Sequence, residues 1–372
     1  MKLQMNRQEE VEAKLDRVRT WLEGAGLEAV VLSSQANFAW LTGGGNNYVY
    51  VGDAAGEASL LVTQDQAYLL TNNIELRRLV EEEVAGLPFE PVYWKWHRRH
   101  EAKEHVARLC NVSRAVSDLG SLDLPLAPEG FRELRCTMLP PEIARYRRLG
   151  TEAAQAVETT CRNAQPGETE LDIAASLAFE CQKRDILPLV NLVAGDERIP
   201  RYRHPLPTSN QIRRTMLVAL TGRRRGLHIS LTRIVSFGPL DSDLAARHRA
   251  VTAVDTRFNL ESRAGASLGE VVSKAIEQYA SEGFPQEWEL HHQGGLTGYA
   301  GREIFGTPDA AYILKHNQVL AWNPSITGTK SEDTVLLTEN RPEILTRTGT
   351  WPELEVELPI GRLLRPSILE QS

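Results

Sequence analysis

Residues 323–338 read Asn323-Pro-Ser-Ile-Thr-Gly-Thr-Lys-Ser-Glu-Asp-Thr-Val-Leu-Leu-Thr338. The last part, from Thr334 to Thr338, is a short apolar run of the kind that forms a strand. Glu332 and Asp333 stand directly before it. The stretch therefore predicts a strand that is entered by two neighbouring carboxylates.

The composition is that of a globular protein with room for two domains. The chain has 372 residues, of which 42% are hydrophobic and 24% are charged. No apolar run approaches the roughly 18 residues of a membrane-spanning helix. The net charge of −7 disfavours nucleic acid as a partner. The four cysteines lack metal or redox spacing, so we expect free thiols in a cytoplasmic protein that binds no membrane.

Helices and strands alternate in the first third of the sequence, which is typical of an α/β domain. The apolar residues Val11, Leu15, Val18 and Leu22 recur at helical spacing. A buried strand over 27–32 is expected to follow. Further strands are expected at 58–62, 67–70 and through Val92, and further helices at about 73–85 and 101–110.

Prolines mark a joint near residue 139. Four of them fall between positions 125 and 141. Beyond the joint, residues 142–163 read as one long helix, and Thr169 with Asp172 forms a capping box for the next helix. We expect domains over 1–139 and 140–345, and a C-terminal tail extension over 346–372 that packs on the surface.

Two motifs resemble the aminopeptidase P, prolidase and creatinase family. The order helix, strand and Asn-x-x-x-Leu-Thr-Gly, here Asn37 to Gly43, is similar to the N-terminal domain of that family. The run Lys-Ser-Glu-Asp-Thr-Val from Lys330 resembles its last catalytic motif, Arg-x-Glu-Asp-Thr-Val, with lysine at the arginine position. The resemblance covers nearly the whole chain. It implies an α/β N-terminal domain of the creatinase type, an α+β pita-bread C-terminal domain, and a homodimer.

The resemblance also implies five metal-ligand positions. In the family, two divalent ions are held by Asp, Asp, His, Glu and Glu, and they activate a hydroxide. In this chain only Glu332 keeps its carboxylate. A pair of hard divalent ions needs several anionic oxygens, so we expect no metal ligand set and no cofactor. The other four positions hold Ala219, Ser230, Gly295 and Asn323.

Other family positions remain polar. His204 begins His-x-x-Pro-Thr, which matches the substrate-side histidine of the family, and we expect His204 and Glu332 to be the catalytic pair. His291 and His292 precede two glycines, and one of the two is expected to face the site. The residues expected to bind substrate are His292, Asn323, Lys330, Arg233, Arg302 and Glu303.

The charge of Glu332 requires a partner. An unpaired carboxylate in a buried site is costly, so we expect Lys330, Arg233 or His204 within reach of Glu332. A site paired in this way is neutral to positive and favours an anionic ligand. A guanidino ligand of the creatine type would need Glu332 or Glu303 free to receive it.

Three functions stay open on the sequence. The first is a metal-independent hydrolase or lyase of a small substrate, of the creatinase type, with His204 as general acid or base. The alternative is a non-catalytic protein that binds a small acid or short peptide. The third is a remodelled mononuclear metal hydrolase built from His204, His292 and Glu332.

Overall fold

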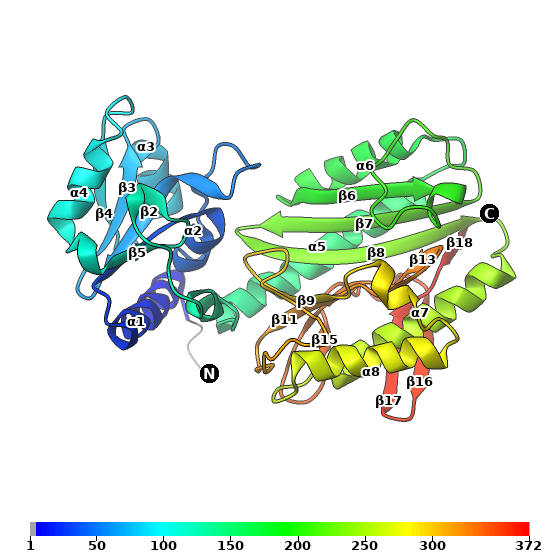
Figure 1. Cartoon of the computed structure of the whole chain (residues 1–372). Coiled ribbons are helices and arrows are strands. Elements are labelled where there is room, and N and C mark those ends of the chain that lie inside the picture. The colour runs from blue at the N-terminus through cyan, green and yellow to red at the C-terminus, as the bar shows by residue number, and fades with distance from the viewer. Residues whose placement is uncertain (1–4, 372) are drawn as a thin grey trace. The chain divides into compact units, whose positions relative to one another are not determined.

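The structure, a computed structural model, describes residues 5–371. The chain divides into two compact units (Figure 1). The first comprises the residues up to Glu142 together with Arg225–Leu227, and the second comprises Ile143–Arg224 and the residues from His228 on. The break falls in the first turn of helix α5 (Pro140–Asn163). Among residues 5–371, no helix is both long enough and apolar enough to cross a membrane.

The first unit is an α/β layer around one five-stranded sheet. Its helices and strands are α1 (Arg7–Ala25), β1 (Ala29–Ser34), α2 (Gln35–Leu41), β2 (Ala55–Thr63), β3 (Ala67–Asn72), α3 (Leu76–Arg78), β4 (Glu90–Trp94), α4 (Glu101–Leu109) and β5 (Ala115–Ser117). The strand order is β4-β3-β2-β1-β5. The pairs β1–β2 and β2–β3 are antiparallel, whereas β3–β4 and β1–β5 are parallel.

Local sequence signals explain the bounds of these elements. Asn6 and Glu9 form a reciprocal capping box at the start of α1, and Gly26 ends the helix in the left-handed conformation. The helix expected at about 73–85 is shorter and irregular, with α3 followed by a π-helical turn over Leu79–Glu83. The predicted hairpin of β2 and β3 is confirmed.

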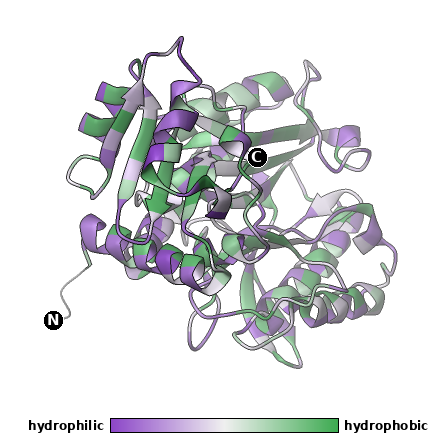
Figure 2. Cartoon of the chain, turned by 60° about the vertical axis from the view of Figure 1, so that its left-hand side comes forward, coloured by the Kyte–Doolittle hydropathy of each residue, from purple (hydrophilic) through white to green (hydrophobic). Residues whose placement is uncertain are grey.

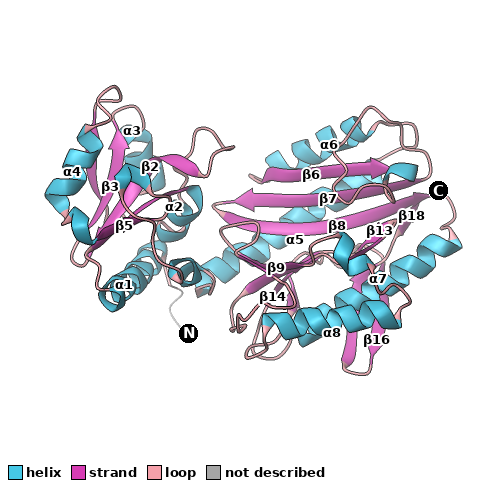
Figure 3. Cartoon of the chain, in the orientation of Figure 1, coloured by secondary structure: helices cyan, strands magenta, loops and turns pink. Residues whose placement is uncertain are grey.

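The second unit contains two larger sheets, β18-β8-β7-β6 and β10-β9-β11-β14-β15, with helices packed on them (Figure 3). Helix α6 packs on β6, and helices α7 and α8 pack on each other. Two small hairpins, β12-β13 and β16-β17, complete the unit. Besides α5, the elements are α6 (Glu170–Gln182), β6 (Leu187–Gly195), β7 (Thr215–Arg224), β8 (Leu227–Phe237), α7 (Ser242–Glu261), α8 (Leu268–Ser281), β9 (Gly294–Thr297), β10 (Ile304–Phe305), β11 (Val319–Trp322), β12 (Ser325–Ile326), β13 (Thr329–Lys330), β14 (Asp333–Leu336), β15 (Glu343–Ile344), β16 (Glu353–Leu358), β17 (Gly361–Pro366) and β18 (Leu369–Gln371).

The central strands of the second unit are buried. All residues of β9, β11 and β14 are buried, and so are all residues of β8 except the last. A strand that is covered on both faces has a continuous apolar sequence instead of alternating apolar and polar residues. This pattern explains why the sequence of residues 334–338 predicts a strand. In Figure 2 the helices carry both hydrophilic and hydrophobic residues, as expected for helices with one packed face.

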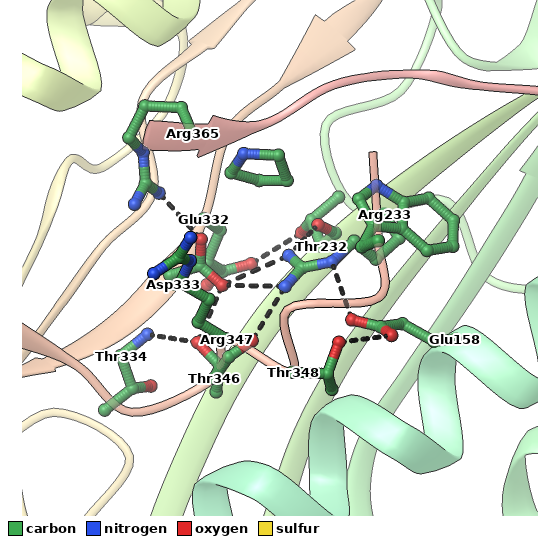
Figure 4. Close-up of polar contacts among 12 residues, drawn as sticks. Glu158, Thr232, Arg233, Glu332, Asp333, Thr334, Thr346, Arg347, Thr348 and Arg365 are labelled. Carbon is green, nitrogen blue, oxygen red and sulfur yellow. Dashed lines mark hydrogen bonds and ion pairs between the residues drawn. The ribbon is translucent and has the colours of Figure 1, made fainter. Parts of the chain in front are cut away.

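The C-terminal tail belongs to the core of this unit. Strand β18 pairs in parallel with β8, and β17 inserts the fully buried Arg365. The Arg365 guanidinium lies 2.8 Å from the Oδ2 atom of Asp333 and also pairs with Asp255 of α7. On the other side, Arg233 of β8 lies 3.1 Å from the Oδ1 atom of Asp333 (Figure 4). The expectation that the tail packs on the surface is therefore wrong for β17. The buried carboxylates of Asp255 and Asp333 need the cation of Arg365.

The substitution Arg365→Met is expected to destabilise the protein by about 3–5 kcal/mol, because it leaves the Asp255 carboxylate buried without its cation. The matched control is Arg362→Met in the same strand, whose ion pair with Glu355 is exposed. That change is expected to cost less than about 1 kcal/mol. Urea unfolding of the full chain at pH 7 measures both. Equal costs for the two variants would contradict a central role for Arg365.

Candidate functional site

The hairpin β12–β13 brings Lys330 to Glu332. The hairpin turns at Gly328, whose φ of +96° favours glycine, and Glu332 follows β13 directly before β14. The Nζ atom of Lys330 lies 2.8 Å from the Oε2 atom of Glu332, and the Thr232 hydroxyl donates a 2.7 Å hydrogen bond to the same oxygen. The prediction that Glu332 has a cationic partner is confirmed.

A second cation reaches the other carboxylate oxygen. The Nη2 atom of Arg302 lies 3.6 Å from the Oε1 atom of Glu332. Burial by itself would raise the pKa of Glu332, but Lys330 and then Arg302 outweigh it, so the pKa lies below its ordinary value. Glu332 is therefore an ionised carboxylate between two cations, and this part of the site carries excess positive charge.

Three histidines converge beside this ion cluster. His204 lies in the loop between β6 and β7, and His291 and His292 lie directly before β9. The Nε2 atoms of His204 and His291 are 2.9 Å apart, and the ring centroids of His291 and His292 are 4.6 Å apart. His291 is buried, whereas His204 and His292 are exposed. Only one of the two adjacent histidines was expected to face the site, but the structure brings both to His204.

The three imidazoles are held neutral. Burial, followed by the charge of Lys330, lowers the pKa of His291 to about 2. Burial and then Arg302 lower the pKa of His292 to about 4. The pKa of His204 is also lowered, first by burial and then by Lys330, while Glu332 acts in the opposite direction. At neutral pH the cluster therefore offers uncharged rings that both donate and accept hydrogen bonds.

The four other positions of the resembled metal site offer no anionic ligand. Ala219 lies in β7, and the Ser230 hydroxyl in β8 lies 3.0 Å from that of Thr221. The amide oxygen of Asn323 is buried and has no hydrogen-bond partner among the residues that the structure describes. Each of these side chains is neutral, so Glu332 is the one charged residue among the five positions.

Gly295 has no room for a side chain. Its φ is +140°, and a Cβ atom there would lie 2.2 Å from the carbonyl oxygen of Ile304 and 2.7 Å from the amide nitrogen of Gly306. Real Cβ atoms essentially never approach other heavy atoms within 3.0 Å. Because both obstacles are backbone atoms of the neighbouring strand and its end, a histidine at this position would require the backbone to move.

Two of the expected substrate-binding residues are engaged with groups of the fold. Arg233 is directed toward Asp333 and donates a 2.8 Å hydrogen bond to the carbonyl oxygen of Thr346. The Oε1 atom of Glu303 accepts hydrogen bonds of 3.0 Å from the backbone N–H groups of Tyr299 and Ala300. Both side chains already hold the fold together, so a role for them in binding stays a prediction.

Sequence reasoning did not select His291 over its neighbour. It did place Arg302 in the site, but as a residue that binds substrate and not as a partner of Glu332. Adjacent histidines before a Gly-Gly pair were the available signal, since glycines let a backbone bend so that both rings point to one side. The pairing of Arg302 with Glu332 joins residues thirty positions apart and leaves no local signal.

The architecture and the site define a two-domain protein of the pita-bread type, with an N-terminal domain of the creatinase kind. The model of metallopeptidase family M24 matches residues 144–339, and the model of the creatinase/prolidase N-terminal domain matches residues 14–123. The chain belongs to metallopeptidase family M24. The resemblance found in the sequence and the fold it implied are both confirmed. No curated protein matches the sequence.

Solved structures share this fold at low identity. The Xaa-Pro dipeptidase from Bacillus anthracis is 17% identical with a TM-score of 0.77, over 97% of this chain and 100% of that one. The prolidase from Pyrococcus horikoshii OT3 is 17% identical with a TM-score of 0.76, over 90% and 98%. The N-terminal domain of FACT complex subunit SPT16 from Cicer arietinum (chickpea) is 12% identical with a TM-score of 0.68, over 92% and 96%.

The substitution Lys330→Met is expected to destabilise the protein most at pH 7 and less in acid. The pKa of Glu332 is lowered in the folded protein, so the ionised carboxylate stabilises the fold. This stabilisation is fully present above the ordinary pKa of 4.5 and is lost as pH falls through the folded-state pKa. Without Lys330 the folded-state pKa of Glu332 rises, because fewer partners oppose burial. The cost should be about 3–5 kcal/mol at pH 7 and should shrink toward pH 4.

Urea unfolding at pH 7.0, 5.5 and 4.5 checks this expectation. The matched control is Lys315→Met, which removes an exposed cation in the same unit. It is expected to change stability by less than about 0.5 kcal/mol at every pH. A cost of Lys330→Met that does not vary with pH would show that Lys330 acts through packing and not through the charge of Glu332.

Proposed function

We propose that side-chain cations take the place of the two metal ions in this family member, and that it binds a small acid or short peptide through its carboxylate. The observation that carries the proposal is the ion cluster in which Lys330 and Arg302 surround Glu332. On this proposal, the charge of Glu332 is neutralised by the side chains of Lys330 and Arg302 and needs no metal ion.

The residues present do not fit two divalent ions. Ala219, Ser230 and Gly295 supply neither a carboxylate nor an imidazole, and Asn323 supplies one neutral oxygen. Hard divalent ions depend on several anionic oxygens. An ion at Glu332 would also face Lys330 and Arg302, and two like unit charges 4 Å apart repel by about 4 kcal/mol near a protein surface. We therefore assign no step of the function to a dinuclear centre.

The same charges favour a carboxylate over a guanidinium. Glu332 is engaged by Lys330, Arg302 and Thr232, and Glu303 is engaged by two backbone N–H groups. A guanidinium would find neither acid free. A ligand carboxylate would instead meet the excess positive charge and the imidazole N–H groups, which form charge-assisted hydrogen bonds with anions.

Exposed apolar side chains flank the histidines and favour a ligand with an apolar portion. Tyr202 and Leu206 lie two residues on either side of His204, Leu290 precedes His291, and Phe305 lies against His292 with ring centroids 5.4 Å apart. A short peptide or an acyl amino acid combines such a portion with a carboxylate. Because the structural relatives include an Xaa-Pro dipeptidase, Xaa-Pro dipeptides are the first candidates.

Thermal unfolding with the dipeptide Ala-Pro and its C-terminal amide tests this proposal, because the two ligands differ only in the carboxylate. At a ligand concentration of about ten times Kd, binding adds about 1.4 kcal/mol, which for a chain of this size raises Tm by about 2 °C. We expect that rise with Ala-Pro and not with the amide. It should disappear in Lys330→Met and persist in Lys315→Met.

Two results would overturn the proposal. Stabilisation by methylguanidinium, abolished by Glu332→Gln, would indicate a free carboxylate and a guanidino ligand. Hydrolysis of Ala-Pro that depends on added Mn²⁺ would indicate that the protein uses the dinuclear metal chemistry of the family.

A metal-independent hydrolase or lyase is the second candidate, and the contact between His204 and His291 favours it. With their Nε2 atoms 2.9 Å apart, one ring donates and the other accepts, so the pair shares a proton. His204 is exposed and can pass that proton to a bound substrate as general acid or base. Product formation in EDTA that is lost in His204→Asn, with Ala-Pro binding retained, would select this candidate over a non-catalytic binding protein.

Three further expectations belong to the same proposal. They are the homodimer implied by the family resemblance, a cytoplasmic location, and domain limits at 1–139, 140–345 and 346–372. Light scattering at micromolar concentration tests the homodimer, and a monomer would count against it.

A further inference from the structure

The histidine cluster lies outside the five ligand positions of the family, and its side chains take no part in the ion pairs of Glu332. Its three members come from two loops, and their ligand-capable atoms all lie within 4.8 Å of one another. We propose that His204, His291 and His292 form a mononuclear site for a late first-row divalent cation, with Zn²⁺ as the preferred ion. This site does not depend on the proposed function.

The spacing of the nitrogens suits one tetrahedral ion. Zn²⁺ binds histidine nitrogen at about 2.0–2.1 Å, which places two ligand nitrogens about 3.3 Å apart. The Nε2 atoms of His204 and His291 are 2.9 Å apart, so they would separate by only a few tenths of an ångström. The rings of His204 and His292 are tilted by 40°, with centroids 5.8 Å apart, and all three ligand nitrogens lie within 4.8 Å of one another. A shift of the exposed His292 ring toward the other two would complete the site.

Buried hydrogen bonds fix the backbone that carries His291 and His292. The amide of Gln293 donates to the carbonyl oxygens of His291 and Trp288, and it accepts a 3.0 Å hydrogen bond from the Tyr279 hydroxyl. Both Gln293 and Tyr279 are buried. The backbone position of two of the three ligands is thus set before any ion binds, which reduces the entropy lost on binding.

The residue before His204 fixes the other loop. Arg203 donates to the hydroxyls of Ser325 and Thr327, at 3.1 Å and 2.9 Å, and it pairs with Glu287. These contacts tie the loop between β6 and β7 to the hairpin β12–β13. Because Glu287 stands shortly before His291, these contacts also hold the two ligand segments toward each other. The Ser325 hydroxyl lies 3.5 Å from the Nδ1 atom of His291, so the Nε2 atom of that ring is the one that faces an ion.

The ligand type selects the ion. Imidazole nitrogen suits Zn²⁺, Co²⁺, Ni²⁺ and Cu²⁺, whereas Mg²⁺ and Mn²⁺ prefer oxygen ligands. The mononuclear site expected from the sequence used Glu332 as its third ligand. Because Lys330 holds that carboxylate, His291 takes its place.

Three histidines leave a fourth coordination position open. The charges of Lys330, Arg302 and Arg203 act on the histidines and oppose an added dication, so an anion is the favoured fourth ligand. On the proposed function, that ligand is the carboxylate of the bound acid; without it, hydroxide or chloride would serve.

Metal binding to the full chain, with no affinity tag and after EDTA treatment and dialysis, tests the site. We expect equilibrium dialysis with elemental analysis to give one Zn²⁺ per chain without any organic ligand. The Co²⁺ form should show the intense visible bands of tetrahedral coordination. Each of His204→Asn, His291→Asn and His292→Asn should weaken Zn²⁺ binding by at least about 100-fold, since even the partners of metal ligands are worth 10–100-fold.

The matched control is His316→Asn, an exposed histidine in the same unit, which should bind like the wild type. Since His204 and His292 are exposed, their variants keep the test valid even where the buried His291 variant fails to fold. Absence of Zn²⁺ binding by the wild type, binding unchanged in the His204 and His292 variants, or two ions per chain lost in Glu332→Gln would each overturn the site. Ala-Pro binding in EDTA is measured separately, so failure of the metal site and failure of carboxylate binding are distinguishable.

Discussion

The two oxygens of the Asp333 carboxylate are shared between two buried guanidinium groups, and the second unit is built around that arrangement. Arg233 comes from the long strand β8, and Arg365 comes from the C-terminal hairpin. Asp255 of α7 shares Arg365, and Thr346 donates to Asp333. One sheet, one helix and the tail are thereby joined through charges that would be costly to bury separately. Truncation of the chain before the tail would therefore remove the buried Arg365 from the core.

This network also determines how the candidate site is presented. Asp333 and Glu332 are neighbours in the chain, but Asp333 is directed toward Arg233 and Arg365 (Figure 4). Glu332 is directed toward Thr232, Lys330 and Arg302. Successive side chains of an extended segment point to opposite faces. Anchoring Asp333 in the core therefore leaves Glu332 directed at the site, where its charge has to be balanced.

Signals that act over a few residues predicted the fold well. The capping boxes of Asn6 with Glu9 and of Thr169 with Asp172 set the starts of two helices, and the apolar run after Asp333 became the buried strand β14. The pairing of Lys330 with Glu332 was also predictable, because the two residues are separated by one position and a buried carboxylate demands a cation. The burial of Arg365 was not predictable, since its partners lie thirty-two and one hundred and ten positions away. The histidine cluster required the same kind of distant information, because its two loops meet only in the folded sheet.

Gly295 limits which side chains this position of the site can hold. At this position the carbonyl of Ile304 occupies the space that the first side-chain carbon would need. A side chain at position 295, an imidazole included, would thus demand a coordinated shift of strands β9 and β10. A single substitution at position 295 therefore cannot add a side-chain ligand to this site, and a redesign would first have to rebuild the pairing of β9 with β10.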